Sequence, residues 1–150
     1  MSNLMHTPQW TDLDTVKVKA KPEGSIWQSA WAFVQGPALL KMEATGQWEY
    51  SKFAKPCSPN GDLDSPLDNK GSVHEKAALG ALIGRVGGSI ADSEGIFIVG
   101  TVCVHKLGKD DAGPLFLAIN DKRSGFEDNS GELEVKISYA KDPTASSQDG

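Results

Sequence analysis

Residues 131–139, GELEVKISY, alternate between apolar and charged side chains. Successive side chains of a β-strand point to opposite faces, so Leu133, Val135 and Ile137 would lie together on one face. Glu132, Glu134 and Lys136, which alternate with them, would lie on the other face. This pattern predicts a strand with one face in a hydrophobic core and the other in water.

The same two-residue period recurs along the chain, and each occurrence is bounded by Gly, Pro, Asn or Asp. Six further strands are predicted: TVKVKA (15–20), GSIWQSAWAFV (24–34), PALLKMEATG (37–46), GALIGRVG (80–87), GIFIVGTVCVHKLG (95–108) and GPLFLAIND (113–121). Only SVHEKAALGAL (72–82) favours a helix, of one or two turns at most. Many short strands separated by turn signals indicate an all-β fold of the β-sandwich type.

The length and composition are those of one domain with an ordinary core. We expect a single domain over residues 1–140 and a flexible polar tail over 141–150. The net charge of −5 disfavours a nucleic-acid partner, because no basic patch would displace counterions from phosphates. No apolar run of about 18 residues occurs, so we expect no membrane insertion.

The first residues lack the basic region and apolar stretch of a signal peptide. We therefore expect a cytoplasmic protein, with extracellular export by a non-classical route as the alternative. Two cysteines, Cys57 and Cys103, are too few for a disulfide framework. Cys103 lies in an apolar run and is expected to be a buried small residue, and a Cys57–Cys103 bridge is the alternative.

Patterns typical of enzymes are weak in this sequence. The histidines at positions 6, 74 and 105 have no zinc-like spacing with each other or with cysteine. The glycine-rich segment GALIGRVGGS (80–89) lacks the Lys-Ser/Thr of a phosphate loop, and its glycines indicate close packing or a bulge. We expect no catalysis. A glycan-processing enzyme with Asp64 and Asp121 as paired carboxylates is the alternative.

Residues 120–131, NDKRSGFEDNSG, gather oxygen-bearing side chains between two predicted strands. Asp121, Asp128 and Asn129 offer the carboxylate and amide oxygens that calcium prefers, and Gly125 would permit a tight curl of the backbone. The same residue types also make ordinary turns. The spacing alone leaves both interpretations open, a calcium site and a solvated hairpin.

A second polar segment, SKFAKPCSPNGDLDSPLDNKG (51–71), is unusually long for a loop in a compact domain. Loops of this length are commonly functional or disordered. Asp62, Asp64 and Asp68 could form another cation site, and a solvated surface loop is the alternative.

GALIGRVGG, GPLFLAIND and DNSGELEVKIS together resemble the PA-IL-like family of bacterial galactose-binding lectins. The resemblance extends roughly from residue 38 to residue 139. It implies a jelly-roll β-sandwich, galactose-binding-domain-like, with two antiparallel sheets. It also implies a calcium-dependent lectin that binds galactose-type glycans through sugar hydroxyls on the ion, and a homo-oligomer, either a dimer or a tetramer.

The resemblance assigns calcium ligands to individual residues. Asp121 would bind Ca²⁺ through its carboxylate and also contact the sugar, and Asn129 matches a family ligand directly. Asp128 stands in place of an asparagine ligand. Gly125, and Tyr50 in the segment GQWEY, would each supply a backbone carbonyl. The carbohydrate-binding residues implied are Asp121, Asp128, Ser65, Asp68 and Tyr50.

The part of the family's site that selects the sugar is different here. The family uses a His and a Gln after a Gly-Asp, whereas the corresponding loop GDLDSPLDNKG (61–71) places Ser65 and Asp68 nearest those positions. An interaction module that keeps the fold, with or without calcium, and binds no galactose is therefore the alternative. Trp48 or Phe53 could provide an apolar face for a sugar ring, although Trp48 is equally suited to core packing.

Overall fold

The computed structural model describes residues 7–65, 68–87 and 95–143, and this part of the chain is built of β-strands without an α-helix. The strands are β1 (Thr11–Lys19), β2 (Gln28–Gln35), β3 (Ala38–Thr45), β4 (Trp48–Glu49), β5 (Leu82–Val86), β6 (Phe97–Ile98), β7 (Val102–Leu107), β8 (Ala112–Ile119) and β9 (Ser130–Lys141). A 3-10 turn, η2, covers Phe126–Asp128. Within these ranges the search for a helix of membrane-spanning length and apolarity found none.

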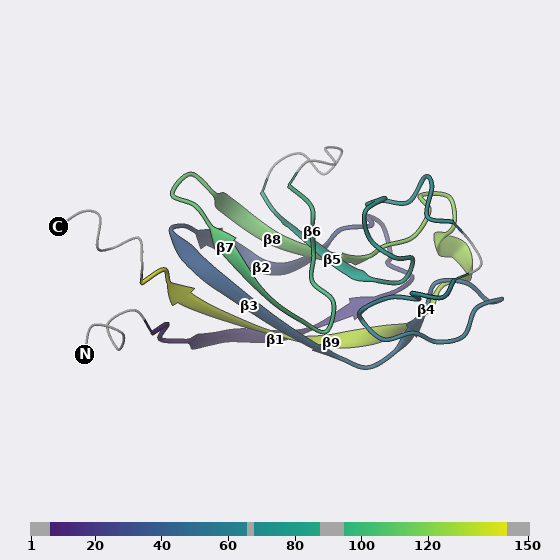
Figure 1. Cartoon of the computed structure of the whole chain (residues 1–150), viewed down its shortest axis with the longest axis horizontal. Coiled ribbons are helices and arrows are strands. Elements are labelled where there is room, and N and C mark those ends of the chain that lie inside the picture. Colours follow the sequence, from purple (N-terminus) through teal and green to yellow (C-terminus); the bar gives the residue numbers. More distant parts are fainter. Residues whose placement is uncertain (1–6, 66–67, 88–94, 144–150) are drawn as a thin grey trace.

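Two antiparallel sheets form the sandwich (Figure 1). One has the order β1-β9-β3-β7, with β4 also pairing with β9, and the other has the order β2-β8-β5-β6. The predicted all-β sandwich is confirmed. In Figure 1, β4, η2 and the loops near them lie at the same end of the sandwich.

Strand β9 is the centre of the five-stranded sheet, because β1, β3 and β4 all pair with it. Val18 pairs with Leu133 and Val16 with Val135, so the apolar faces of β1 and β9 coincide. Leu133, Val135 and Ile137 are at most 1% exposed, as the alternation predicted. The strand continues to Lys141 and Asp142 is buried, so both residues belong to the folded sandwich. Residues 144–150 of the expected tail lie outside the described residues.

The predicted strand 95–108 is wrong as one element, because the chain changes sheets within it. β6 pairs with β5, whereas β7 pairs with β3 in the opposite sheet. The change occurs at Gly100, whose φ of +65° favours glycine, and the Thr101 N–H donates to Asn60 Oδ1 at 2.9 Å. The sequence pattern did not predict this crossover, because apolar residues continue on both sides of Gly100.

The core lies between the sheets and is built from large apolar side chains. Leu40, Met42, Leu115, Leu117 and Ile119 are fully buried there. A second cluster covers the other face of the four-stranded sheet and comprises Trp27, Val73, Ala77, Ala81, Ile83 and Ala118. Val73 and Ala77 come from the segment predicted as a short helix. That prediction is wrong: 72–79 forms turns whose apolar side chains pack on the sheet.

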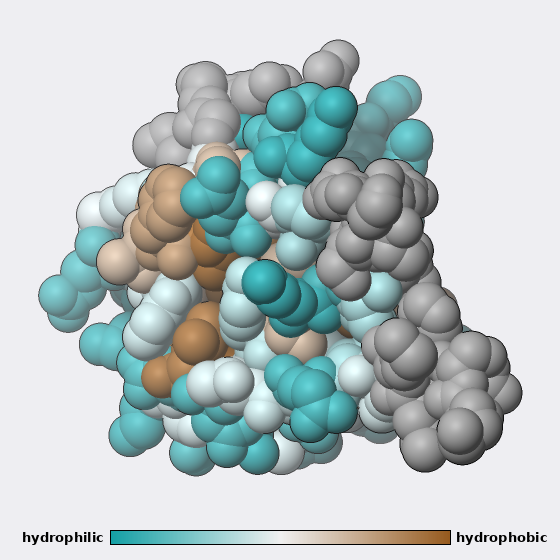
Figure 2. Space-filling model, turned by 90° about the vertical axis from the view of Figure 1, so that its left-hand side faces the viewer, coloured by the Kyte–Doolittle hydropathy of each residue, from teal (hydrophilic) through white to brown (hydrophobic). Residues whose placement is uncertain are grey.

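The end of the sandwich opposite β4 offers only small hydrophobic areas among hydrophilic and neutral atoms where described residues are visible (Figure 2). Gly84, the glycine of β5, serves close packing, as expected. A Cβ on Gly84 would lie 2.8 Å from the Phe97 ring, so no larger residue fits without a shift. The polar loops gather at the β4 end of the sandwich.

Both cysteines are free, so the alternative of a Cys57–Cys103 bridge is wrong. Cys57 is buried, and burial raises the pKa of its thiol to about 11. Cys103 is only half-buried against the core, less than expected, and burial also raises the pKa of its thiol.

The two thiols should therefore differ in reactivity, because the thiolate is the reactive form. With a disulfide-exchange reagent at pH 8, at most one thiol of the native protein should react, and it should be that of Cys103, slowly. In denaturant without reductant, both thiols should react rapidly. In the native Cys103→Ser variant, no thiol should react. Two rapid native thiols, or none after denaturation, would contradict the structure.

Candidate functional site

Asp121 and Asn129 lie at the two ends of the connection between β8 and β9, and each is 4% exposed. Asp121 Oδ1 accepts the Lys122 N–H at 2.7 Å, and Asn129 Nδ2 donates to the Ala20 carbonyl at 3.0 Å. The remaining oxygens, Asp121 Oδ2 and Asn129 Oδ1, are buried and have no hydrogen-bond partner in the described structure. A buried oxygen without a donor costs free energy unless something binds it. These two atoms therefore mark a candidate ligand site.

Asp128 joins this connection to the loop after β4. Its Oδ2 accepts the Lys52 N–H at 3.2 Å and the Ser51 hydroxyl at 3.4 Å. Gly125 borders the Asp121 carboxylate, since a Cβ built on it would lie 3.4 Å from Oδ1 and 3.5 Å from Oδ2. The structure thus brings Asp121, Gly125 and Asn129 together, with Asp128 near enough for its charge to act on Asp121. A fully solvated hairpin does not describe this loop.

Tyr50 follows β4 and is 2% exposed. Its hydroxyl donates to Asp62 Oδ2 and accepts from Ser65 Oγ, each at 2.7 Å. Burial is the main reason that the pKa of Tyr50 is raised to about 12, and the hydrogen bond to Asp62 adds to it. The Tyr50 side chain therefore fastens the 61–65 segment. Its backbone leads directly into Ser51 and Lys52, which hold Asp128.

Ser65 and Asp68, the predicted sugar-selecting residues, have different surroundings. Ser65 is bonded to Tyr50, whereas Asp68 is exposed and its Oδ1 lies 3.8 Å from Lys122 Nζ. Trp48 is 1% exposed and its indole N–H donates to the Gly80 carbonyl at 2.6 Å, so it is a core residue and no sugar platform. Phe53, at 86% exposed, is accessible.

Asn120 organises the site's surroundings, although sequence reasoning did not single it out. It is fully buried, and its Oδ1 accepts the His74 N–H at 2.8 Å. Its Nδ2 donates to the carbonyls of His74, Ala77 and Ala78 at 2.9–3.1 Å. The available signal was an asparagine directly after an apolar strand, where a side-chain amide can replace a missing strand partner.

The donor set suits a hard cation such as calcium. Asp121, Asp128 and Asn129 provide two carboxylates and an amide oxygen, the ligand types that calcium takes alongside backbone carbonyls. No cluster of three or more His, Cys, Asp or Glu side chains occurs in residues 7–65, 68–87 and 95–143. Amide and carbonyl oxygens would have to complete the shell. No zinc-like cluster therefore forms there around His74 or His105, and His6 is outside the described residues.

The electrostatics of Asp121 also suit a cation. The pKa of its carboxyl is raised to about 6, mainly by burial and to a smaller extent by the nearby charge of Asp128. The Lys122 N–H and the Asn129 side chain oppose this rise. A divalent cation beside the carboxylate would favour its charged form and offset the cost of burying that charge.

Comparison with known proteins supports the fold. No family model and no curated protein matches the sequence. Among solved structures, the EclA N-terminal domain, named a PllA-like lectin, superposes with a TM-score of 0.63 at 18% identity. The match covers 87% of this chain and 98% of that domain. The chain therefore has a lectin-like β-sandwich fold.

The buried carboxyl should make the metal-free protein less stable at neutral pH. A folded-state pKa of about 6 against 3.8 means that Asp121 contributes stability below pH 4 that is lost as pH rises through 6. With chelator present, Asp121→Asn should therefore gain stability relative to wild type between pH 4 and 7, by up to about 3 kcal/mol. Urea unfolding at each pH measures this, with exposed Asp110→Asn as the control. A constant difference between wild type and Asp121→Asn would contradict it.

Removing the Asn120 amide should loosen the turns at 72–79. Asn120→Ala leaves the His74 N–H without its acceptor and removes one of the donors of the His74, Ala77 and Ala78 carbonyls, which should lower the free energy of unfolding by about 2 kcal/mol. Urea denaturation measures the change, and Gln47→Ala, at an exposed position, is the control. Equal stability of the two variants would refute the role of Asn120.

Proposed function

We propose that the protein is a calcium-dependent lectin that binds galactose or galactosides, with sugar hydroxyls coordinating the ion. The observation that carries this proposal is the pair of buried oxygens, Asp121 Oδ2 and Asn129 Oδ1, that lack a hydrogen-bond partner. They lie in a sandwich that is similar to a PllA-like lectin domain. A bound cation would satisfy both oxygens at once.

Five residues would hold the ion: Asp121 and Asp128 through carboxylates, Asn129 through its amide oxygen, and Tyr50 and Gly125 through backbone carbonyls. A bound calcium supplies open positions at which two neighbouring hydroxyls of a sugar can replace water. Residues of the β8–β9 connection and of the loop after β4 would thus act together. The Asp128 hydrogen bonds to Ser51 and Lys52 hold these two loops in place.

The carboxylates would also orient the sugar. Asp121 and Asp128 can accept hydrogen bonds from the hydroxyls that reach the ion, and their charge strengthens those bonds. The cis pair O3 and O4 of galactose can reach one ion together, which favours galactose. A neutral ligand also suits a chain with a net charge of −5. Assembly into a dimer or tetramer would raise the avidity of a weak single site.

A second candidate, an interaction module that binds no galactose, rests on the surroundings of Ser65 and Asp68. The Ser65 hydroxyl is bonded to Tyr50, and Asp68 pairs with Lys122. Neither arrangement offers an evident contact for the exocyclic hydroxyl of galactose. Calcium binding without any glycan on an array would favour this candidate.

Calorimetry separates the two candidates. Wild-type protein with calcium should bind methyl galactoside, and chelation should abolish the response. Asp121→Asn and Asp128→Asn should each weaken calcium binding at least about tenfold, because affinity follows the charge of the ligands. Asp110→Asn should bind as wild type does. Sugar binding that persists in chelator, or unchanged calcium affinity of Asp121→Asn, would refute the proposal.

A further inference from the structure

The start of the β8–β9 connection pairs with a segment from another loop. Ser72 and Lys122 form an isolated antiparallel bridge. Beside this bridge, the Val73 N–H donates to the Asp121 carbonyl at 3.1 Å. The candidate calcium ligand Asp121 therefore lies in a short ladder that the segment around Ser72 completes.

Lys122 brings a positive charge to the candidate site. It directly follows Asp121, whose Oδ1 accepts the Lys122 N–H at 2.7 Å. Its ammonium is also close enough to favour the ionised form of Asp121. In solution at physiological salt, charges act over about 8 Å, so this local charge matters more to a ligand than the net charge of −5 on the chain.

Other charged side chains lie on the same two segments. Lys70 and Arg123 are exposed cations, and the Arg123 N–H donates to the Gly71 carbonyl at 3.4 Å. Asp68 and Glu75 are exposed carboxylates that offset part of this positive charge. A calcium ion on Asp121 would leave the cations in excess.

Asp68 is the partner of the Lys122 ammonium in this structure. Its Oδ1 lies 3.8 Å from Lys122 Nζ, and the two side chains are 77% and 40% exposed, respectively. An ion pair that is long and open to water contributes little free energy. A negatively charged group of a ligand can therefore replace the Asp68 carboxylate at small cost.

Ser72 adds a second donor at this position. Side chains of residues that face each other in an antiparallel bridge extend to the same side, so the Ser72 hydroxyl and the Lys122 side chain are neighbours. Ser72 is 6% exposed, and its Oγ has no hydrogen-bond partner in the described part of the chain. A buried hydroxyl beside an ammonium suits an anionic oxygen, because both groups can donate to it.

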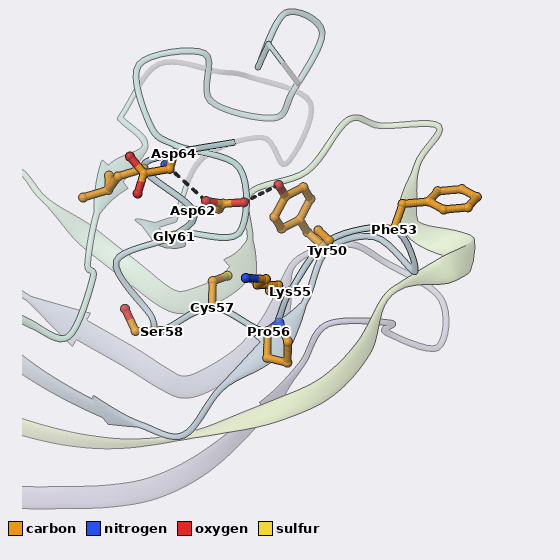
Figure 3. A pocket seen from close by; sticks show the side chains of 11 residues that line it. Tyr50, Phe53, Lys55, Pro56, Cys57, Ser58, Gly61, Asp62 and Asp64 are labelled. Atoms are coloured by element: carbon orange, nitrogen blue, oxygen red, sulfur yellow. Dashed lines mark hydrogen bonds between the residues drawn. The ribbon is translucent and has the colours of Figure 1, made fainter. Parts of the chain in front are cut away.

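The polar side chains of the loop after β4 are engaged with each other instead. The Tyr50 hydroxyl is bonded to Asp62 and Ser65, and Figure 3 shows Tyr50 directed at Asp62. Asp62 Oδ1 also accepts the Asp64 N–H at 3.1 Å. Ser65 is thus committed to the loop, and the replaceable partner is on the Lys122 side.

We propose that the ligand is an anionic galactoside, whose carboxylate or sulfate group binds the Lys122 ammonium and the Ser72 hydroxyl in place of Asp68. The inference rests on the proposed function, because the calcium ion would hold the sugar hydroxyls. The ion would also offset the charges of Asp121 and Asp128, which would otherwise repel an anion. The anionic group would then form charge-assisted hydrogen bonds at the edge of the site.

Calorimetry at saturating calcium with methyl galactoside, its C6 carboxylate (methyl galacturonoside) and its 6-sulfate tests this assignment. At low ionic strength, at least one anionic ligand should bind about fivefold more tightly than the neutral one. High salt should reduce this ratio, because the pair with Lys122 is exposed.

Four variants locate the effect. Lys122→Gln should bring the ratio close to one, and Ser72→Ala should lower it part of the way. Asp68→Asn should raise it, because the asparagine oxygen can still accept the Lys70 N–H while the competing charge is gone. Lys109→Gln, an exposed lysine in the β7–β8 turn, should keep the wild-type ratio.

The outcomes distinguish this inference from the function it rests on. Equal affinity for all three galactosides would overturn the anion site alone, and so would a ratio that survives in Lys122→Gln, since the carboxylate would then be binding the ion itself. An unchanged ratio in Ser72→Ala would overturn the role of Ser72. A Lys122-dependent gain for the carboxylate only would support a uronic acid, and one for the sulfate only would support a sulfated sugar. No binding of any galactoside in calcium would overturn the proposed function as well.

Discussion

A carboxylate buried without a full set of donors is the constraint on which the site depends. Asp121 follows β8 in one sheet, and Asn129 precedes β9 in the other, so the two side chains come close only when the sandwich is assembled. Asp121 Oδ1 accepts a backbone N–H and Asn129 Nδ2 donates to a backbone carbonyl, which leaves Asp121 Oδ2 and Asn129 Oδ1 buried without a partner. Burial and the charge of Asp128 both disfavour ionised Asp121, so a cation would stabilise the folded protein.

The loop after β4 is held in place by the core. Trp48 exchanges backbone hydrogen bonds with Cys57 and donates its indole N–H to Gly80, while Tyr50 anchors Asp62 and Ser65. These buried contacts hold the loop without using its exposed side chains, such as Phe53. Exposed side chains on a loop that the core holds in place can change without disturbing the fold.

Much of the fold could be predicted from the sequence, because alternation reports directly which face of a strand is buried. It placed Leu133, Val135 and Ile137 correctly, along with the strands around them. It failed at Gly100, where apolar residues continue across a change of sheet, and at 72–79, where an apparently helical pattern belongs to turns packed on a sheet.

The candidate site was predictable in its residues but not in its surroundings. Oxygen-bearing side chains at 121–129 were visible as a group, and the structure brings them together. The role of Asn120 and the bonding of Ser65 to Tyr50 depend on contacts between segments that are separated in sequence. Single-sequence patterns carry no record of such contacts.

The central claim is that the oxygens of Asp121 and Asn129 share one cation. Anomalous scattering from a crystal grown in calcium chloride tests it most directly. A single strong peak is expected between Asp121 Oδ2 and Asn129 Oδ1, at about 2.3–2.6 Å from each, and it should disappear after soaking in chelator. A crystal in millimolar calcium with no peak there, and with those side chains turned into solvent, would contradict it.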